Sequence, residues 1–298
     1  MISRYRILLI IFLLILTVAG GTYTYRLYRS FLTLPEEETL TEEGEEEPFP
    51  FDHFDILLLG LDGRDGLNDR TDTIILLSID TVQKKGRLLS IPRDTRVQLR
   101  PGSYDKINAA YVYGGVDLAK QATGDLLKTH IDRFAAINFD GVVDLVNILG
   151  GVEVDVPVRM YVPLEGIDLQ AGPGQLLNGA DALAYMRYRG TSGGDMDRIV
   201  RQQEVLVKLA KNLFTLKNIL NIRRFLETAL DKMDTDLTIS ELAALASISS
   251  VIVENGIETY VLPGVNRIVD SLWYFLPDLD TFRNDLAQKE LPSTASGR

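Results

Sequence analysis

The apolar segments DILLLG (residues 55–60), TIILLSID (73–80) and RLLSIP (87–92) decide the fold. Each is short and apolar almost without interruption, which is typical of strands that are buried on both faces. A sheet made of such strands needs a layer of helices on each side. The segments therefore predict a central sheet between two helical layers.

The rest of the chain supplies those helices and more strands. Helices are expected at 116–128, 140–149, 178–188, 195–214, 217–231 and 240–254, with a last helix after Asp278. Further strands are expected at 133–139, 152–156 and 258–262. Because strands and helices alternate, the sequence predicts an α/β or α+β sandwich within residues 51–298, with helices on both sides of a central mixed sheet (an α-β-α arrangement).

Charged residues stand at the ends of the first three strands. Asp62 follows the first strand, Asp72 precedes the second, and Arg93 follows the third. If the strands form an antiparallel meander, these residues meet at one edge of the sheet, where two carboxylates suit Mg²⁺ together with water and substrate phosphate. The alternative is that the aspartates are turn residues and that Arg93 forms a surface ion pair.

A second group of charges lies in the segment RYRGTSGGDMDRIVRQQ (187–203). Arg198 and Gln202 have i, i+4 spacing and continue into Val205 and Leu209, so they lie on the stripe that the helix should bury. Guanidinium groups bind phosphate bidentately, and the unpaired N–H groups at the helix start add affinity for anions. The segment predicts a pyrophosphate site, with a solvated basic helix end as the alternative.

Residues 1–28 are expected to form a transmembrane anchor. Arg4 and Arg6 precede the apolar run ILLIIFLLILTVA (7–19), and the positive-inside rule then predicts a cytoplasmic N-terminus and an extracellular C-terminal domain on a single-pass protein of the cell membrane. Small residues at 19–21 leave a cleaved signal peptide as the alternative. Either interpretation exports the domain.

Residues 29–50 are expected to form an acidic linker. Eight glutamates between 36 and 47 carry most of the net charge of −11, so the remainder is close to neutral and no nucleic acid is expected as a partner. The chain has no cysteine and two histidines, which excludes disulfides, cysteine nucleophiles and histidine-rich zinc sites.

Several segments, in the same order, resemble the LytR-CpsA-Psr family of cell-envelope proteins over about residues 51–290. They are LGLD (59–62), RTDT (70–73), SIPRDT (90–95), KINAAY (106–111), FDGVVD (139–144), LNGADALAYMRYR (177–189) and DRIVRQQ (197–203). One departure is Ala109, where many members carry a histidine. This departure puts a histidine role at that position in doubt and leaves Lys106 unaffected.

The resemblance implies a phosphotransferase outside a Gram-positive type of cell. Such an enzyme moves a glycopolymer, for example wall teichoic acid or capsule, from a polyprenyl-pyrophosphate carrier to a peptidoglycan acceptor, beside the membrane. It implies Mg²⁺ as the cofactor, bound by Asp62 and Asp72. The implied pyrophosphate-binding residues are Arg93, Lys106, Arg187, Arg189, Arg198 and Gln202, and the implied catalytic residues are Arg70, Asp72, Arg93 and Asp94.

Three points stay open at this stage. Asp72 or Asp94 would deprotonate the attacking sugar hydroxyl. The same site could instead hydrolyse the pyrophosphate with water, or belong to an anchored envelope-binding or regulatory module without turnover. For the lipid tail of the carrier, the apolar segments 142–149 and 205–213 are expected to line a tunnel between helices and sheet, with an ordinary packed core as the alternative.

Overall fold

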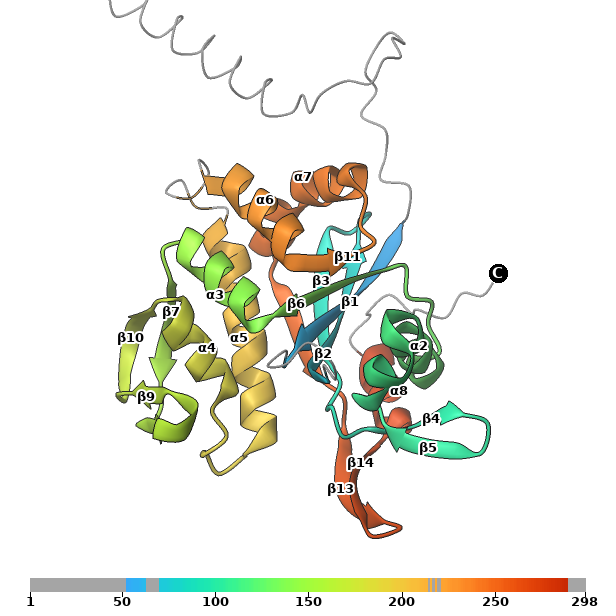
Figure 1. Ribbon diagram of the computed structural model, residues 1–298. Coiled ribbons are helices and arrows are strands. Elements are labelled where there is room, and N and C mark those ends of the chain that lie inside the picture. Colours follow the sequence, from blue (N-terminus) through green and yellow to red (C-terminus); the bar gives the residue numbers. More distant parts are fainter. Residues whose placement is uncertain (1–51, 63–69, 214, 216–217, 219–220, 289–298) are drawn as a thin grey trace, which may run out of the picture. The chain divides into compact units, whose positions relative to one another are not determined.

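The structure is a computed structural model that describes residues 52–62, 70–213, 215, 218 and 221–288 (Figure 1). The expected anchor (1–28) and acidic linker (29–50) lie outside the described residues. Within the described part of the chain, no helix combines the length and the hydropathy that a membrane span requires.

A six-stranded mixed sheet lies at the centre, as predicted. Its order is β11-β6-β1-β2-β3-β12. β1, β2 and β3 form the expected antiparallel meander, whereas β6 is parallel to β1 and β12 is parallel to β3. The strands are β1 (His53–Leu61), β2 (Thr71–Asp80), β3 (Lys85–Ser90), β6 (Arg133–Asn138), β11 (Met233–Thr235) and β12 (Ile257–Val261).

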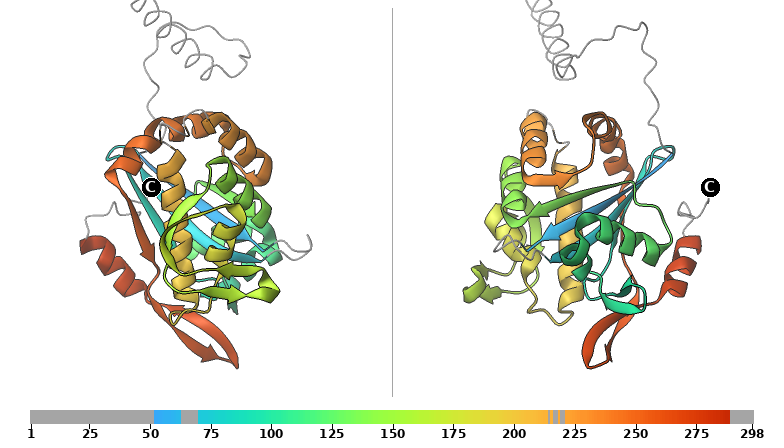
Figure 2. Two further views of the ribbon diagram at one scale, coloured as in Figure 1. Left: turned by 90° about the vertical axis from the view of Figure 1, so that its left-hand side faces the viewer. Right: turned by 45° about the vertical axis from the view of Figure 1, so that its right-hand side comes forward.

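Helices cover both faces of this sheet (Figure 2). Leu57 and Leu59 of β1 pack in one apolar cluster with α2 and α8, while Phe54 and Ile56 pack on the opposite face with α7. This alternation of side chains along a strand explains the uninterrupted apolar sequence. The helices are α2 (Ala109–Leu127), α3 (Phe139–Ile148), α4 (Gly179–Arg187), α5 (Asp195–Leu213), α6 (Ile222–Lys232), α7 (Ile239–Asn255) and α8 (Leu279–Gln288).

A second apolar core lies between α3, α4, α5 and a small sheet. The predicted strand at 152–156 is β7 (Val152–Val156), but it pairs with β10 (Gly172–Leu177) and not with the central sheet. The short hairpin of β8 (Met160–Val162) and β9 (Ile167–Leu169), joined by a 3₁₀ turn at Pro163–Glu165, packs on the same core. Val146 and Val205, in the segments expected to line a lipid tunnel, are both 0% exposed in this cluster. At these two positions the packed-core alternative holds.

Two further hairpins lie at one end of the sheet and were not predicted. One consists of β4 (Arg96–Arg100) and β5 (Ser103–Lys106), and the other of β13 (Gly264–Val269) and β14 (Leu272–Pro277). A β-bridge between Thr95, which directly precedes β4, and Phe275 of β14 joins the two hairpins. Both hairpins flank the edge of the sheet at which Asp72 and Arg93 lie.

Candidate active site

The ends of β1, β2 and β3 meet at one edge of the central sheet. Gly60 of β1 pairs with Thr73 of β2, so Asp62 and Asp72 flank the same edge, as the sequence predicted. The backbone N–H of Asp62 donates to the carbonyl of Arg70 at 3.3 Å, which places Arg70 there too. Because β3 runs antiparallel to β2, Arg93 also follows the sheet at this edge.

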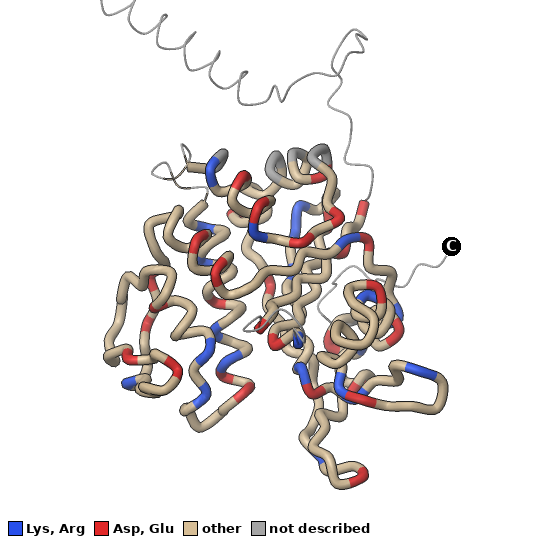
Figure 3. Tube along the Cα trace, viewed as in Figure 1, with Lys and Arg blue, Asp and Glu red and all other residues tan. Residues whose placement is uncertain are grey.

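Asp72 is the centre of a cluster of three arginines. Its Oδ1 accepts from Arg93 at 2.6 Å, and its Oδ2 lies 3.4 Å from Arg189 and 3.9 Å from Arg198. Arg198 also donates to the backbone carbonyl of Asp72 at 3.3 Å. The structure therefore brings residues from β2, from the end of β3, from the segment after α4 and from α5 together. In Figure 3, Lys and Arg (blue) and Asp and Glu (red) lie close together in the lower part of the α4–α5 region.

Arg198 is the most deeply buried of these cations. Its side chain is 3% exposed, and Asp195, one helical turn earlier, holds it with a 3.0 Å ion pair. Burial lowers the pKa of Arg198, and the Asp195 carboxylate only partly offsets that effect. The Nε of Arg198 has no hydrogen-bond partner within the described residues. A buried cation with a spare donor is costly unless an anion completes its surroundings, so this position favours an anionic ligand.

Arg93 has a different electrostatic environment. Burial lowers the pKa of its guanidinium, but the charge and the hydrogen bond of Asp72 outweigh burial and the pKa is raised. Arg93 and Asp72 are both about one-fifth exposed, at 21% and 19%. Their pair is therefore reachable from solvent, and Arg93 can exchange its carboxylate partner for another anion.

α5 is fixed in place by residues next to Arg198. Arg201 donates to the backbone carbonyls of Tyr185 and Tyr188, at the end of α4. Gln203 donates to Ser90 Oγ at 2.8 Å and to the carbonyl of Tyr260 at 2.6 Å, which ties α5 to β3 and β12. These contacts hold the helix against both the sheet and α4, so they set the position of Arg198.

α4, which ends just before Arg189, is positioned by its first residues. Asn178 caps the helix, because its side chain accepts from the N–H of Asp181 at 3.0 Å. The N–H of Gly179 donates to Asn147 at 2.8 Å, and a Cβ at Gly179 would meet the carbonyl oxygen of Val143 at 2.2 Å. A glycine is needed for this close approach of α4 to α3.

The remaining predicted site residues have other contacts. Lys106 forms a 2.7 Å ion pair with Asp94, directly beside Arg93. Arg187 lies 3.5 Å from Glu165, with its guanidinium over the ring of Phe139 at 4.9 Å. Gln202 donates to the carbonyl of Met186 at 3.5 Å, and Arg70 is exposed. Within the described residues, Arg70, Asp94, Lys106, Arg187 and Gln202 form no ion pair or hydrogen bond with Asp72. The structure therefore divides the predicted set into a cluster on Asp72 and residues around it.

Sequence reasoning missed Asp195 as a site residue. It pairs with Arg198 and lies 3.8 Å from Arg189, so it orients both cations. The only signal was its i, i+3 spacing to Arg198 at the start of the expected helix.

Asp62 and Asp72 are the two carboxylates that a metal could use at this edge. No cluster of three or more Asp, Glu or His side chains suited to a metal occurs in the described part of the chain. Mg²⁺ commonly takes one or two protein carboxylates and completes its shell with water and substrate phosphate. The donor set fits such an ion, but only together with an anionic ligand, because three arginines already surround Asp72.

Known proteins resemble this chain in sequence and in structure. The model of the LytR_cpsA_psr family matches residues 33–290. The chain is 32% identical over 316 residues to the Polyisoprenyl-teichoic acid--peptidoglycan teichoic acid transferase TagV of Bacillus subtilis. The alignment covers 97% of this chain and 80% of that protein.

Two solved structures have the same fold. The crystal structure of B. subtilis TagV superposes with a TM-score of 0.69 at 34% identity and covers 80% of this chain and 97% of that one. The structure described as TagT bound to LIIa-WTA superposes with a TM-score of 0.68 at 27% identity, and the match covers 85% of this chain and 94% of that one.

Proposed function

The chain belongs to the LytR-CpsA-Psr family, and from this premise we propose that it is a phosphotransferase that moves a glycopolymer from a polyprenyl-pyrophosphate carrier to peptidoglycan. One relative is named a teichoic acid transferase, and a related structure holds LIIa-WTA. The observation that carries the proposal is the convergence of Arg93, Arg189 and Arg198 on Asp72 at the sheet edge.

The arginines would bind the pyrophosphate of the carrier. Three guanidiniums face the carboxylates of Asp72 and Asp195, so cations are in excess before a ligand arrives. A pyrophosphate offers several acceptor oxygens, and bidentate arginine contacts would fix its orientation. Arg198, held by Asp195 and by the packing of α5, is preorganised for this role, so little reorganisation accompanies the reaction.

Transfer requires one bond to form and one to break. The oxygen of an acceptor hydroxyl attacks the phosphorus that carries the glycan, and the bond from that phosphorus to the bridging oxygen breaks. Polyprenyl phosphate leaves with the negative charge, which Arg93 and Arg189 stabilise, and the proton of the hydroxyl passes to Asp72 or Asp94. Arg70 and Lys106, at the same edge, would balance charge around these groups.

Mg²⁺ is the cofactor that we propose, with Asp62 and Asp72 as its protein ligands. When bound, the ion would neutralise part of the pyrophosphate charge. We further propose that the domain lies outside the cell, tethered to the membrane by residues 1–28, so that carrier and peptidoglycan both reach it. The flanking arginines and the apolar run of this segment support that placement.

Reconstitution tests this function. The full chain is incubated with a synthetic polyprenyl-pyrophosphate glycan, with and without peptidoglycan oligomers and Mg²⁺. A transferase releases polyprenyl phosphate only when the acceptor is present. Release without an acceptor would instead indicate a phosphatase, and tight binding without any release would indicate a module that holds the lipid without turnover.

A further inference from the structure

We propose that the β4–β5 and β13–β14 hairpins form a docking surface for a glycan chain that carries phosphodiester groups. This inference rests on the proposed function and names the class of polymer that the site accepts. The surface, called here the arginine–tyrosine stripe, consists of Arg96, Tyr104 and Arg267, and the buried ring of Tyr274 links the two arginines. Both hairpins lie at the lower end of the domain as drawn in Figure 1, and a bridge between Thr95, just before β4, and Phe275 of β14 joins them.

The stripe is joined to the site through the segment that follows Arg93. The N–H of Asn108 donates to the carbonyl of Arg93 at 3.2 Å, and Lys106 pairs with Asp94 at 2.7 Å, so β5 ends beside the site. The N–H of Phe275 donates to the carbonyl of Asp94 at 2.8 Å, so β14 is fixed to the same segment. A polymer whose pyrophosphate end lies at Arg93 has both hairpins directly beside its path.

The β4–β5 hairpin presents its cations on one face. Arg96 is the cross-strand partner of Lys106, and Gln98 is the partner of Tyr104, so all four side chains lie on the same face. The guanidinium of Arg96 stacks on the ring of Tyr104 at 3.9 Å from its centroid. Stacking of this kind fixes the plane of the guanidinium and lowers the entropy that a ligand would have to remove.

The β13–β14 hairpin continues this surface. Arg96 also lies 5.8 Å from the ring centroid of Tyr274, and Tyr274 is the cross-strand partner of Arg267. Tyr274 is buried at 6% exposure, whereas Arg267 is exposed. The buried ring therefore links one arginine to the next, and Lys106, Arg96 and Arg267 form a row of cations.

The arginines of this row are not neutralised by the protein. Among the described residues, Arg96 and Arg267 form no ion pair and no side-chain hydrogen bond, and the Nε of Arg96 is buried without a partner. The nearby carboxylates are engaged elsewhere, since Asp94 binds Lys106 and Asp105 accepts from the hydroxyl of Tyr113 at 2.9 Å. Asp270 lies in the turn at the far end of β13.

This chemistry selects an anionic glycan over a neutral one. Planar guanidiniums bind phosphate oxygens in pairs, and cations spaced along a surface suit a polymer with regularly spaced phosphodiesters. The sugar backbone of a neutral glycan offers no such partner, so it would gain little from Arg96 or Arg267. The donor polymer is therefore the occupant that the stripe fits, and its repeats would follow the hairpins outward from the site.

The test measures binding of two probes to the full-length protein in detergent. The probes are a fluorescently labelled oligo(glycerol phosphate) without lipid and inorganic pyrophosphate. The stripe variant carries Arg96→Ala and Arg267→Ala. The control variant carries Arg159→Ala and Arg283→Ala, which removes the same charge from exposed ion pairs with Asp168 and Asp280. Thermal unfolding confirms that each variant is folded.

The stripe variant should bind the oligomer roughly tenfold more weakly or worse, while its affinity for pyrophosphate stays at the level of the control. Arg198→Ala should bind pyrophosphate more weakly than the control does, while its affinity for the oligomer stays at the level of the control. The inference is overturned if stripe and control variants bind the oligomer equally, if the unaltered protein does not bind it, or if a neutral chitin oligosaccharide binds as tightly. Unchanged pyrophosphate affinity in Arg198→Ala would instead contradict the proposed function.

Discussion

At the scale of single residues, the most deeply buried cation of the cluster, Arg198, gives the sharpest test of anion binding. Arg198→Ala removes a guanidinium that is 3% exposed and leaves Asp195 and Asp72 without this partner. We expect pyrophosphate binding, measured by calorimetry, to weaken by ~2–5 kcal/mol, as for other desolvated charge partners. Arg224→Ala, at an exposed position on α6, is the matched control and should cost little. Equal losses in both variants would indicate diffuse electrostatics.

Asp72 neutralises part of the arginine cluster and is also a proposed ligand of Mg²⁺. One substitution separates these two roles. Asp72→Asn keeps the shape of the side chain but removes the charge that Arg93, Arg189 and Arg198 share. We expect pyrophosphate binding without metal to be retained or tightened, because the carboxylate no longer competes for the arginines. The additional affinity that Mg²⁺ gives the unaltered protein should disappear. A Mg²⁺ effect of unchanged size in Asp72→Asn would rule out this residue as a ligand.

Part of the site could be predicted at this scale, and part could not. Asp62, Asp72 and Arg93 follow or precede apolar strands, so strand pairing alone brings them to one edge. The pairing of Arg198 with Asp72 depends on how α5 packs on β3, through contacts such as Gln203 with Ser90. No periodicity in the sequence encodes that packing, and for the same reason Asp195 was missed.

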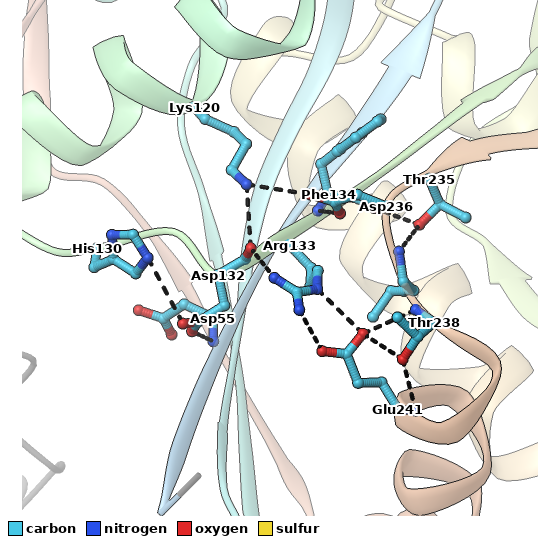
Figure 4. A network of polar contacts seen from close by, with 11 residues as sticks. Asp55, Lys120, His130, Asp132, Arg133, Phe134, Thr235, Asp236, Thr238 and Glu241 are labelled. Carbon is cyan, nitrogen blue, oxygen red and sulfur yellow. Dashed lines mark hydrogen bonds and ion pairs between the residues drawn. The ribbon is translucent and has the colours of Figure 1, made fainter. Parts of the chain in front are cut away.

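At the scale of elements, α7 is tied to the sheet by a polar network at Glu241 (Figure 4). Glu241 completes a capping box with Thr238 and forms a 2.7 Å ion pair with Arg133 of β6. Glu241→Ala removes a helix cap and leaves a charge without its partner, so we expect a loss of ~2–4 kcal/mol in the free energy of unfolding. Asp280→Ala, in a pair whose carboxylate is 92% exposed, should change it by less than ~0.5 kcal/mol.

The contribution of Glu241 should depend on pH. Burial raises the pKa of its carboxyl, but hydrogen bonds from Arg133 and Thr238 outweigh burial, and the pKa falls below its ordinary value of 4.5. A lowered pKa in the folded state gives stability that is present above the ordinary value and is lost as the pH falls through the folded value. Denaturant unfolding at several pH values should therefore show the deficit of Glu241→Ala shrinking below about pH 4.5. A deficit that is constant down to acidic pH would contradict this cause.

Elements differed in how well the sequence predicted them. Five of the six strands of the central sheet and α3, α4 and α5 were predicted because their apolar runs, their periodicity or a cap such as Asn178 are clear. The short edge strand β11 was not predicted. The β4–β5 and β13–β14 hairpins were missed because their strands are rich in charged and exposed residues and lack a clear apolar alternation. The Pro101-Gly102 turn of the first hairpin was a signal that went unused, whereas the turn of the second, Asp270-Ser271, contains no glycine. α2 begins at Ala109, earlier than the predicted start at residue 116, and Gly114 and Gly115 interrupt its helical geometry just before that predicted start.

At the scale of the whole molecule, the placement of the domain is the main prediction that lies outside the described residues. Arg4 and Arg6 precede the apolar run, so the N-terminus should be cytoplasmic and the folded domain should be outside. Protease added to intact protoplasts should remove the domain while leaving a cytoplasmic control protein whole. A fully protected domain would contradict the export and with it the envelope function.

The fold class could be predicted from the apolar strands in the sequence. The packing of the second core could not be predicted in this way. A run that is buried on both faces requires helices on both sides of a sheet, which is what β1, β2 and β3 have. By contrast, β7 alternates buried and exposed residues and pairs with β10, so its place outside the central sheet depends on contacts with α3 and α5.

The central claim is that the chain joins a glycopolymer to peptidoglycan through a phosphodiester bond. The most direct test digests the reconstituted product with a muramidase and identifies the linked fragment by mass spectrometry. We expect a peptidoglycan fragment bonded to the glycan through one phosphate, formed by the unaltered protein and by Arg224→Ala, and absent with Arg198→Ala. Free glycan phosphate as the sole product, or equal yields from Arg198→Ala and the unaltered protein, would contradict it.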